Sequence, residues 1–237
     1  MTSPHTATAR FDRRSLAALD EPVRRYFEHA LSDGAPVARG MRLTMSGRIN
    51  VGRRLQFTAE QEFRGHAFEW RARAGWGPFK PLHVLDTYAD GQGSTDGKLF
   101  GRVRFMRADD QNTARAAAAR AAAEAIWVPG ALLPGPTVSW RAASEGLIVA
   151  RVNVPPEHPD VAIGISETGA VRSVSLSRWG NVGQKEFGYI PFGGDIHAER
   201  RFGDVVLPSR VTVGWWHGTP RYKPFFEATI LSAKPLP

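Results

Sequence analysis

The 237-residue sequence contains no cysteine, which excludes disulfide bonds, thiolate metal ligands and a cysteine nucleophile. It also lacks a run of about 20 apolar residues that would cross a bilayer as a helix. Residues 1–22 lack the apolar stretch of about 7 to 15 residues that a signal peptide needs. From these absences we expect a cytoplasmic protein without a transmembrane segment.

The common signatures of cofactor and metal chemistry are also missing. The sequence has no phosphate-binding GxxxxGK[ST], no HExxH, no GxSxG and no GxGxxG after a strand. The glycine-rich stretch "DGQGSTDG", residues 90–97, is typical of a turn. We therefore expect neither a cofactor nor a metal.

Acidic residues are fewer than basic ones, 23 against 31, and the formal net charge is +8. Such a balance can indicate a nucleic-acid partner, because lysine and arginine neutralise phosphates. Here, however, the basic residues are scattered singly or in pairs such as Arg13/Arg14 and Arg200/Arg201, and they occupy the polar positions of alternating strands. This pattern favours a solvated outer face, so we expect no nucleic-acid partner.

Hydrophobic periodicity predicts a mainly β, α+β fold in one domain over residues 1–237. Apolar residues recur at helical spacing from Val23 to Leu31 behind an N-cap at Asp20, which predicts a helix over residues 20–33. Residues 40–106 and 137–233 alternate with the period of two that is typical of antiparallel strands. We expect ten to twelve strands, five of them before residue 112, and poor order over residues 1–12.

An alanine-rich helix is predicted over residues 112–128, and it runs into "WVPGALLP", residues 127–134. Small side chains let helix and strand backbones approach closely, which favours a strongly curved sheet or half-barrel wrapped on this helix. Pro129 and Pro134 prevent further helix and favour an extended path. We expect this segment to lie across the open mouth of a cavity.

Several separated motifs occur in an order that resembles an uncharacterised bacterial family, a domain of unknown function of about this length. They include "VRRYFEHAL", "FTAEQEF", "WVPGALLP", "IPFGG" and "FGDVVLPSRVTVGWW". The resemblance covers nearly the whole chain and implies no activity. "RFGDVVLPSRV" is also similar to the late hairpin of the half-barrel lipoprotein carriers of the bacterial periplasm, which implies a cavity for acyl chains. The missing signal peptide departs from those carriers.

One constellation of possible metal ligands occurs in "DIHAER". Asp195, His197 and Glu199 alternate, so an extended strand points all three to one face. Together with His217 they would resemble a site of two histidines and one carboxylate. Counting from the following hairpin pairs His197 with about Arg210, which leaves His217 beyond the strand. We expect a polar face with ion pairs to Arg210 and no metal site.

A second pair of candidates is Glu60 and Glu62, two residues apart on one predicted strand. Such a carboxylate pair can perform acid–base chemistry if burial raises the pKa of one member. Both alternate with apolar residues, however, and Arg71 and Arg73 are predicted on the neighbouring strand. This pattern favours an outer face with carboxylate–arginine pairs.

Aromatic residues are abundant, with seven tryptophans and thirteen phenylalanines. They either fill a large β core or line an apolar pocket. Trp215 and Trp216 are adjacent, so they must face opposite sides of a strand. The residues that we expect to bind a ligand are Trp70, Trp127, Leu132, Leu133, Arg178, Trp179 and Trp215.

Two functions fit this pattern. The first is binding of a lipid or other apolar small molecule between sheet and helix, with Arg71, Arg73 or Arg178 contacting an anionic head group. The second is a cofactor-independent enzyme of isomerase, cyclase or hydrolase type that encloses an apolar substrate in the same cavity. Its candidate acids and bases are Glu60, Asp86, Tyr88 and His197. A third, structural role follows if the apolar lip is a dimer interface.

Overall fold

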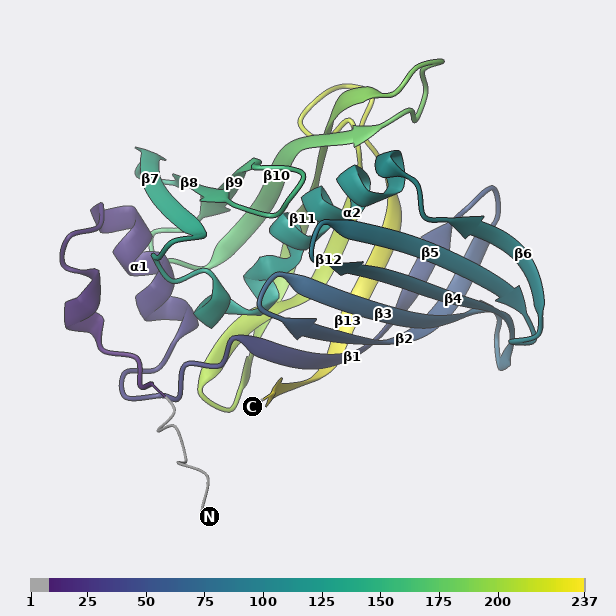
Figure 1. Ribbon diagram of the computed structural model, residues 1–237. Helices are drawn as coiled ribbons and strands as arrows, with labels where there is room; N and C mark the ends of the chain where they lie inside the picture. Colours follow the sequence, from purple (N-terminus) through teal and green to yellow (C-terminus); the bar gives the residue numbers. More distant parts are fainter. Residues whose placement is uncertain (1–8, 237) are drawn as a thin grey trace, which may run out of the picture.

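The computed structural model describes residues 9–236 and confirms the mainly β fold (Figure 1). Thirteen strands form one antiparallel sheet. Their bounds are β1 Gly40–Asn50, β2 Arg54–Arg64, β3 Ala67–Trp76, β4 Phe79–Ala89, β5 Gln92–Leu99, β6 Val103–Ala108, β7 Val138–Ser144, β8 Leu147–Val152, β9 Asp160–Ile165, β10 Val171–Gly180, β11 Gly188–Phe202, β12 Val205–Trp215 and β13 Lys223–Leu236.

Two consecutive meanders make up this sheet, in the order β6-β5-β4-β3-β2-β1-β13-β12-β11-β10-β9-β8-β7. The first and last strands are neighbours and join the two halves, with Met41 opposite Pro235 and Ile49 opposite Phe226. Six strands precede the long helix instead of the five predicted. The extra one arises because Phe100 and Gly101 take positive φ angles of 52° and 70°, which turns the chain between β5 and β6.

The long helix α2 (Gln111–Glu124) continues in a 3₁₀ turn, η2 (Ala125–Trp127), close to the predicted bounds. Asp110 caps it by accepting a hydrogen bond from the Thr113 amide at 2.8 Å. Alanines of α2 are buried against the sheet, and a Cβ on Gly93 of β5 would lie only 2.7 Å from the Ala117 methyl. Small residues on both elements therefore allow the close approach that the sequence predicted.

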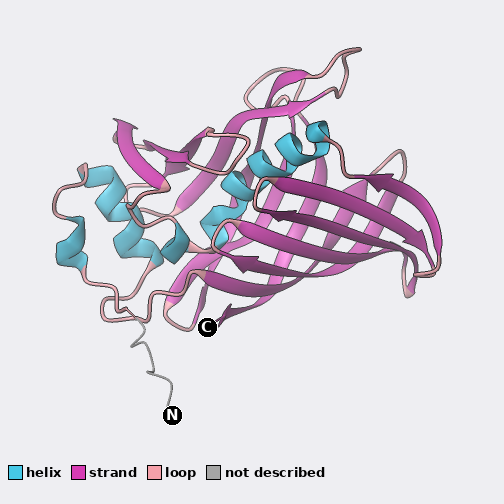
Figure 2. Cartoon of the chain, in the orientation of Figure 1, coloured by secondary structure: helices cyan, strands magenta, loops and turns pink. Residues whose placement is uncertain are grey.

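Helix α2 lies across the strands and contacts β4 and β5 in one half of the sheet and β10 in the other (Figure 2). The sheet is nevertheless neither closed nor strongly curled, so the predicted half-barrel is wrong in this respect. A helix is about 10–12 Å across with its side chains, which keeps the two halves apart. We call the face that contacts α2 the inner face and the opposite one the outer face.

The N-terminal helix α1 (Glu21–Ala30) is shorter than predicted and packs on β7, β8 and β12. Tyr26 and Phe27 are buried, and their ring centroids lie 5.7 and 5.3 Å from that of Trp140. Phe11 is also buried, and its amide donates to the Ala35 carbonyl at 2.8 Å. Phe11 thus anchors residues 9–12, while residues 1–8 of the segment predicted to be poorly ordered lie outside the described residues.

Residues 127–134 are not extended, contrary to the prediction. After η2 the chain forms a second 3₁₀ turn, η3 (Pro129–Ala131), in which the Leu132 amide donates to the Pro129 carbonyl at 3.1 Å. Pro129 occupies the first position of this turn, where a fixed φ and a missing amide hydrogen cost nothing.

In the described part of the chain, no helix is long and apolar enough to cross a membrane.

Candidate functional site

A cavity of about 200 Å³ lies between α2 and the inner face of the sheet. Its walls are mainly apolar and come from strands that are far apart in the sequence. Alternation along each strand turns these side chains inward, and the β1–β13 pairing brings the two halves together. The apolar lining residues include Ile49, Trp70, Trp127, Phe192, Val213 and Phe226.

Arg120 of α2 is the centre of an ion network on one side of the cavity. Its Nη1 donates to Asp86 Oδ2 and its Nε to Glu124 Oε1, both at 2.8 Å. Buried Gln61 donates to the second oxygen of Glu124 at 2.6 Å. Burial acts to lower the pKa of Arg120, but Glu124 and Asp86 outweigh it, so this pKa is raised. Arg120 therefore pairs with both carboxylates.

Arg178 of β10 lies on the other side and is held differently. Its Nε donates to the Ala116 carbonyl of α2 at 3.0 Å, and its guanidinium lies 4.5 Å from the ring centroid of Phe192 and 5.1 Å from that of Trp215. Within residues 9–236 it forms no ion pair. Burial, together with the charge of Arg120, lowers the pKa of Arg178 to about 10. The positive charge of Arg178 is therefore poorly compensated.

Two polar atoms at the cavity wall are buried without a hydrogen-bond partner among the described residues. They are Trp70 Nε1, a donor, and Asp86 Oδ1, an acceptor. Trp70 and Asp86 lie directly opposite each other on β3 and β4. An unpaired buried polar group costs roughly 1–3 kcal/mol. The cavity thus presents unused hydrogen-bonding capacity in an otherwise apolar enclosure.

Three of the seven predicted ligand-binding residues, Trp70, Trp127 and Arg178, line this cavity. Trp127 is buried, and its Nε1 donates to the Pro208 carbonyl at 3.0 Å, which fixes the ring at the end of α2. Trp215 packs behind the wall, with its ring centroid 5.0 Å from that of Phe192.

The other three predicted ligand-binding residues lie away from the cavity. Leu132 is buried in the core, where its carbonyl accepts from Trp140 Nε1 at 2.8 Å, and Leu133 is half-buried beside it. Trp179 donates to Asn112 Oδ1 at 2.8 Å. Residues 127–134 therefore do not form the expected lip, because their 3₁₀ turns fold Leu132 into the core.

Of the four candidate acids and bases, Asp86 lines the cavity. Tyr88 is buried nearby on β4 and donates to the Pro155 carbonyl at 2.5 Å. Burial, with a smaller contribution from Asp90, raises the pKa of Tyr88 to about 12. Glu60 is exposed on the outer face, and His197 is exposed with its Nε2 2.9 Å from Thr212 Oγ1. The fold does not bring these four groups together.

Of the two candidate carboxylates of β2, Glu62 forms arginine pairs on the outer face, whereas Glu60 forms no ion pair among the described residues. Arg42 Nε donates to Glu62 Oε1 at 2.8 Å, and Arg71 lies opposite Glu60 while forming an ion pair with Glu69. Arg71 is exposed, as is Arg73. Neither arginine reaches the cavity, so Arg178 is the one of the three predicted head-group contacts that does.

His217 lies beyond the end of its strand, as expected, yet it returns to the "DIHAER" segment. Strand β12 ends at Trp215, and Trp216 has a φ of 63°, which turns the chain back toward β11. His217 Nε2 consequently lies 3.1 Å from Asp195 Oδ1. The turn also removes the premise that Trp215 and Trp216 sit on opposite faces of one strand.

Glu199 departs from the expected alternation as well. The β11–β12 register shifts on both sides of Ala198, which lies opposite Arg210. Such bulges redirect side chains, and Glu199 Oε2 lies 2.7 Å from His29 Nε2 on α1. Arg210 forms no ion pair within residues 9–236. Among these residues no group of three or more histidines and carboxylates could hold a metal ion.

Sequence reasoning missed Arg120 and Glu124, which organise the polar side of the cavity. A signal for them existed. They are four residues apart, the spacing at which side chains meet on a helix, and they interrupt an otherwise alanine-rich run. Charges placed so sparsely in a helix that must be buried indicate an internal ion network.

These features define an open antiparallel sheet with a helix-flanked apolar cavity. The chain belongs to the Family of unknown function (DUF6544), which matches residues 9–228. This confirms the resemblance to a family of unknown function. No curated protein matches the chain. The crystal structure of a DUF1329 family protein from Desulfovibrio piger is similar at a TM-score of 0.42 and 10% identity, covering 91% of this chain and 94% of that one.

Proposed function

We propose that this protein binds a lipid or another apolar small molecule that carries an anionic head group, in the cavity beside α2. The observation that carries the proposal is Arg178. It is a poorly compensated guanidinium, with no ion pair in residues 9–236, on the wall of an apolar enclosure. Asp86 and Glu124 both pair with Arg120, which leaves Arg178 without a carboxylate partner. An anion bound beside Arg178 would supply that partner.

The apolar walls supply the remaining affinity. Burying one methylene contributes roughly 0.8 kcal/mol, so even a short chain gains several kcal/mol. The volume of about 200 Å³ is below the roughly 300–1,000 Å³ of drug-sized pockets. We therefore assign the cavity to a ring, a branch or one end of a chain, with the rest passing the half-buried Phe225 and Phe226.

The polar groups define the head group that would fit. A carboxylate or phosphate can accept two parallel hydrogen bonds from a guanidinium. It can also accept from Trp70 Nε1, which has no partner in the described residues.

Native mass spectrometry of the purified protein, followed by organic extraction and lipid analysis, tests the proposal. We expect an anionic adduct of defined mass that Arg178→Leu no longer retains. The matched control is Arg172→Leu, because Arg172 is an exposed arginine on the same strand. A clean ligand-free mass from several expression hosts contradicts the proposal, as does equal retention by Arg178→Leu.

A second candidate function is supported by Asp86, whose Oδ1 is buried at the wall without a hydrogen-bond partner in the described residues. A carboxylate oxygen so placed can accept a proton from an enclosed substrate. If the protein is such an enzyme, the extracted ligand should be converted by the wild type and left unchanged by Asp86→Asn. Retention of an unconverted ligand by both proteins supports binding alone.

A further inference from the structure

A cluster of large apolar side chains is exposed at the ends of the β3–β4 and β5–β6 hairpins. Trp76, Phe79, Phe100, Val103 and Phe105 are each more than half exposed. We call these five residues the hairpin patch. Exposed apolar residues occur singly on most proteins, whereas contiguous groups mark interaction sites.

Three members of the hairpin patch lie together, and Val103 and Phe105 lie on the adjoining edge strand β6. The ring centroids of Phe79 and Phe100 are 6.0 Å apart, and Trp76 lies opposite Phe79 in the β3–β4 pairing. Val103 lies opposite Leu99 in the β5–β6 pairing. Phe105 covers Gly97, where a Cβ would lie 2.7 Å from its ring. The patch therefore spans two neighbouring hairpins at one edge of the sheet (Figure 1).

The patch is on the same side of the sheet as α2. Gly93 of β5 faces Ala117 of the helix, and Gly97 of the same strand faces Phe105. Residues four apart on a strand point to one face. Helix α2 covers Gly93 but leaves the far ends of β5 and β6 bare, and β6 is exposed along nearly its whole length.

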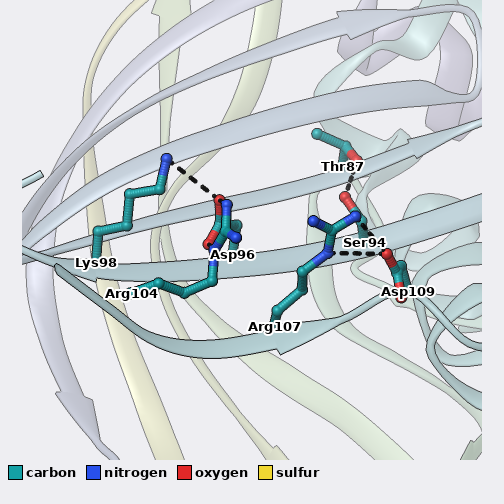
Figure 3. Close-up of polar contacts among 7 residues, drawn as sticks. All are labelled: Thr87, Ser94, Asp96, Lys98, Arg104, Arg107 and Asp109. Atoms are coloured by element: carbon teal, nitrogen blue, oxygen red, sulfur yellow. Dashed lines mark hydrogen bonds and ion pairs between the residues drawn. The ribbon is translucent and has the colours of Figure 1, made fainter. Parts of the chain in front are cut away.

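Basic side chains lie on the same two hairpins, but those of β4, β5 and β6 point to the outer face, on the other side of the sheet from the patch. Residues 97–107 include four basic residues and no acidic one. Asp96 is shared by Arg104, at 2.9 and 3.2 Å, and by Lys98 at 3.4 Å, and Arg107 pairs with Asp109 (Figure 3). Lys80 and Arg102 have no ion pair among the described residues. Five basic side chains are thus balanced by only two acidic ones, which leaves these hairpins with a net positive charge.

We propose that the hairpin patch docks on the surface of an anionic lipid bilayer. Aromatic rings insert at the level of the head groups, where their apolar bodies and polar surroundings are both satisfied. Lysine and arginine on the outer side of the same hairpins are attracted by the negative surface potential of anionic lipids when the hairpin ends enter the head-group layer. The net positive charge of these hairpins selects this occupant over a neutral apolar partner. The inference does not depend on the cavity having a ligand.

Co-sedimentation with vesicles tests this inference. Vesicles of phosphatidylcholine mixed with phosphatidylglycerol should bind the wild type, and vesicles of phosphatidylcholine alone should bind it at least about tenfold more weakly. Trp76→Ala/Phe79→Ala/Phe100→Ala and, separately, Lys80→Glu/Arg102→Glu should each weaken binding to the mixed vesicles at least about tenfold. Four of the five positions are exposed and Lys80 is half-buried at the surface, so both variants should unfold at the wild-type temperature.

Two matched controls carry the same chemical changes elsewhere. Leu147→Ala removes an exposed apolar residue from the other end of the strand order, and Arg172→Glu reverses an exposed charge on β10. Both should bind vesicles like the wild type. Arg178→Leu should also bind them normally, which separates this inference from the cavity proposal.

Three results would overturn membrane docking. The first is no binding of the wild type to the anionic vesicles at low ionic strength. The second is equal binding of the wild type to both vesicle types, or binding of the aromatic triple variant to the mixed vesicles as strong as that of the wild type. The third is a wild-type dimer in analytical ultracentrifugation that the triple variant converts to monomer, with no vesicle binding by either, since the patch would then join two copies of the chain.

Discussion

The two faces of the sheet carry the same ionic groups in different surroundings. On the outer face, Arg42 and Glu62 form a pair whose side chains are 49% and 28% exposed. On the inner face, Arg120 pairs with Asp86 and Glu124, and all three side chains are at most 21% exposed. Water screens the outer pair, whereas the inner charges depend on one another. The comparison shows why the proposed ligand site rests on Arg178, which lies on the inner face without a carboxylate of its own.

The largest effect is expected from Arg120→Leu, which leaves Asp86 and Glu124 enclosed without their cation. Removing one partner of a buried ion network costs about 3–5 kcal/mol. Urea unfolding should show this loss in the free energy of unfolding. A loss below about 1 kcal/mol would mean that the inner face is as well solvated as the outer one.

Tyr88 gives a pH-dependent test of inner-face burial. Its pKa is raised to about 12 in the folded state, above the ordinary value of 10.0, so the folded protein keeps a proton that the unfolded chain releases. Stability from this group is fully present below pH 10 and falls as pH rises toward 12. In Tyr88→Phe, the loss of stability between these pH values should be smaller by an amount on the order of 2 kcal/mol. Unfolding curves at several alkaline pH values measure it, and identical slopes for both proteins would contradict the assignment.

Arg178→Leu should behave unlike Arg120→Leu although both remove an arginine from the same cavity. The loss of a hydrogen bond to the Ala116 carbonyl is offset by removal of a charge that burial disfavours. We expect the free energy of unfolding to stay within about 1 kcal/mol of wild type, as judged by urea unfolding of ligand-free protein. A loss as large as that of Arg120→Leu would show that Arg178 has a structural partner after all.

The smallest effect is expected on the outer face. Arg42→Leu removes an exposed pair, and such pairs contribute about 0–1 kcal/mol after solvent screening. Urea unfolding should therefore place this variant within about 1 kcal/mol of the wild type. A larger loss would remove the distinction between the two faces.

Local periodicity predicted much of the fold. The alternation in residues 40–64 and the alanine-rich helix fixed the elements and their approximate bounds, because both depend on neighbouring residues alone. The turns that the sequence misjudged depend on single backbone angles, as at Phe100 and Trp216, or on a bulge, as at Ala198. Periodicity does not encode any of these.

The candidate site was predicted in part for the same reason. Trp70, Trp127 and Arg178 are in the cavity because alternation and helix length place them there. Arg120 pairs with both carboxylates, and Arg178 is left without one. This arrangement follows from the pairing of β3 with β4 and from the position of α2 over β5 and β10. Those are long-range contacts, and a local pattern does not contain them.

The most direct test of the proposed function compares decanoate with decanol, which share one chain and differ in the charge of the head group. Titration calorimetry with ligand-free protein should show tighter binding of decanoate by the wild type, loss of that preference in Arg178→Leu and its retention in Arg172→Leu. Equal binding of the two probes by the wild type, or a preference that survives in Arg178→Leu, would contradict the role of Arg178 as the receiver of an anionic head group.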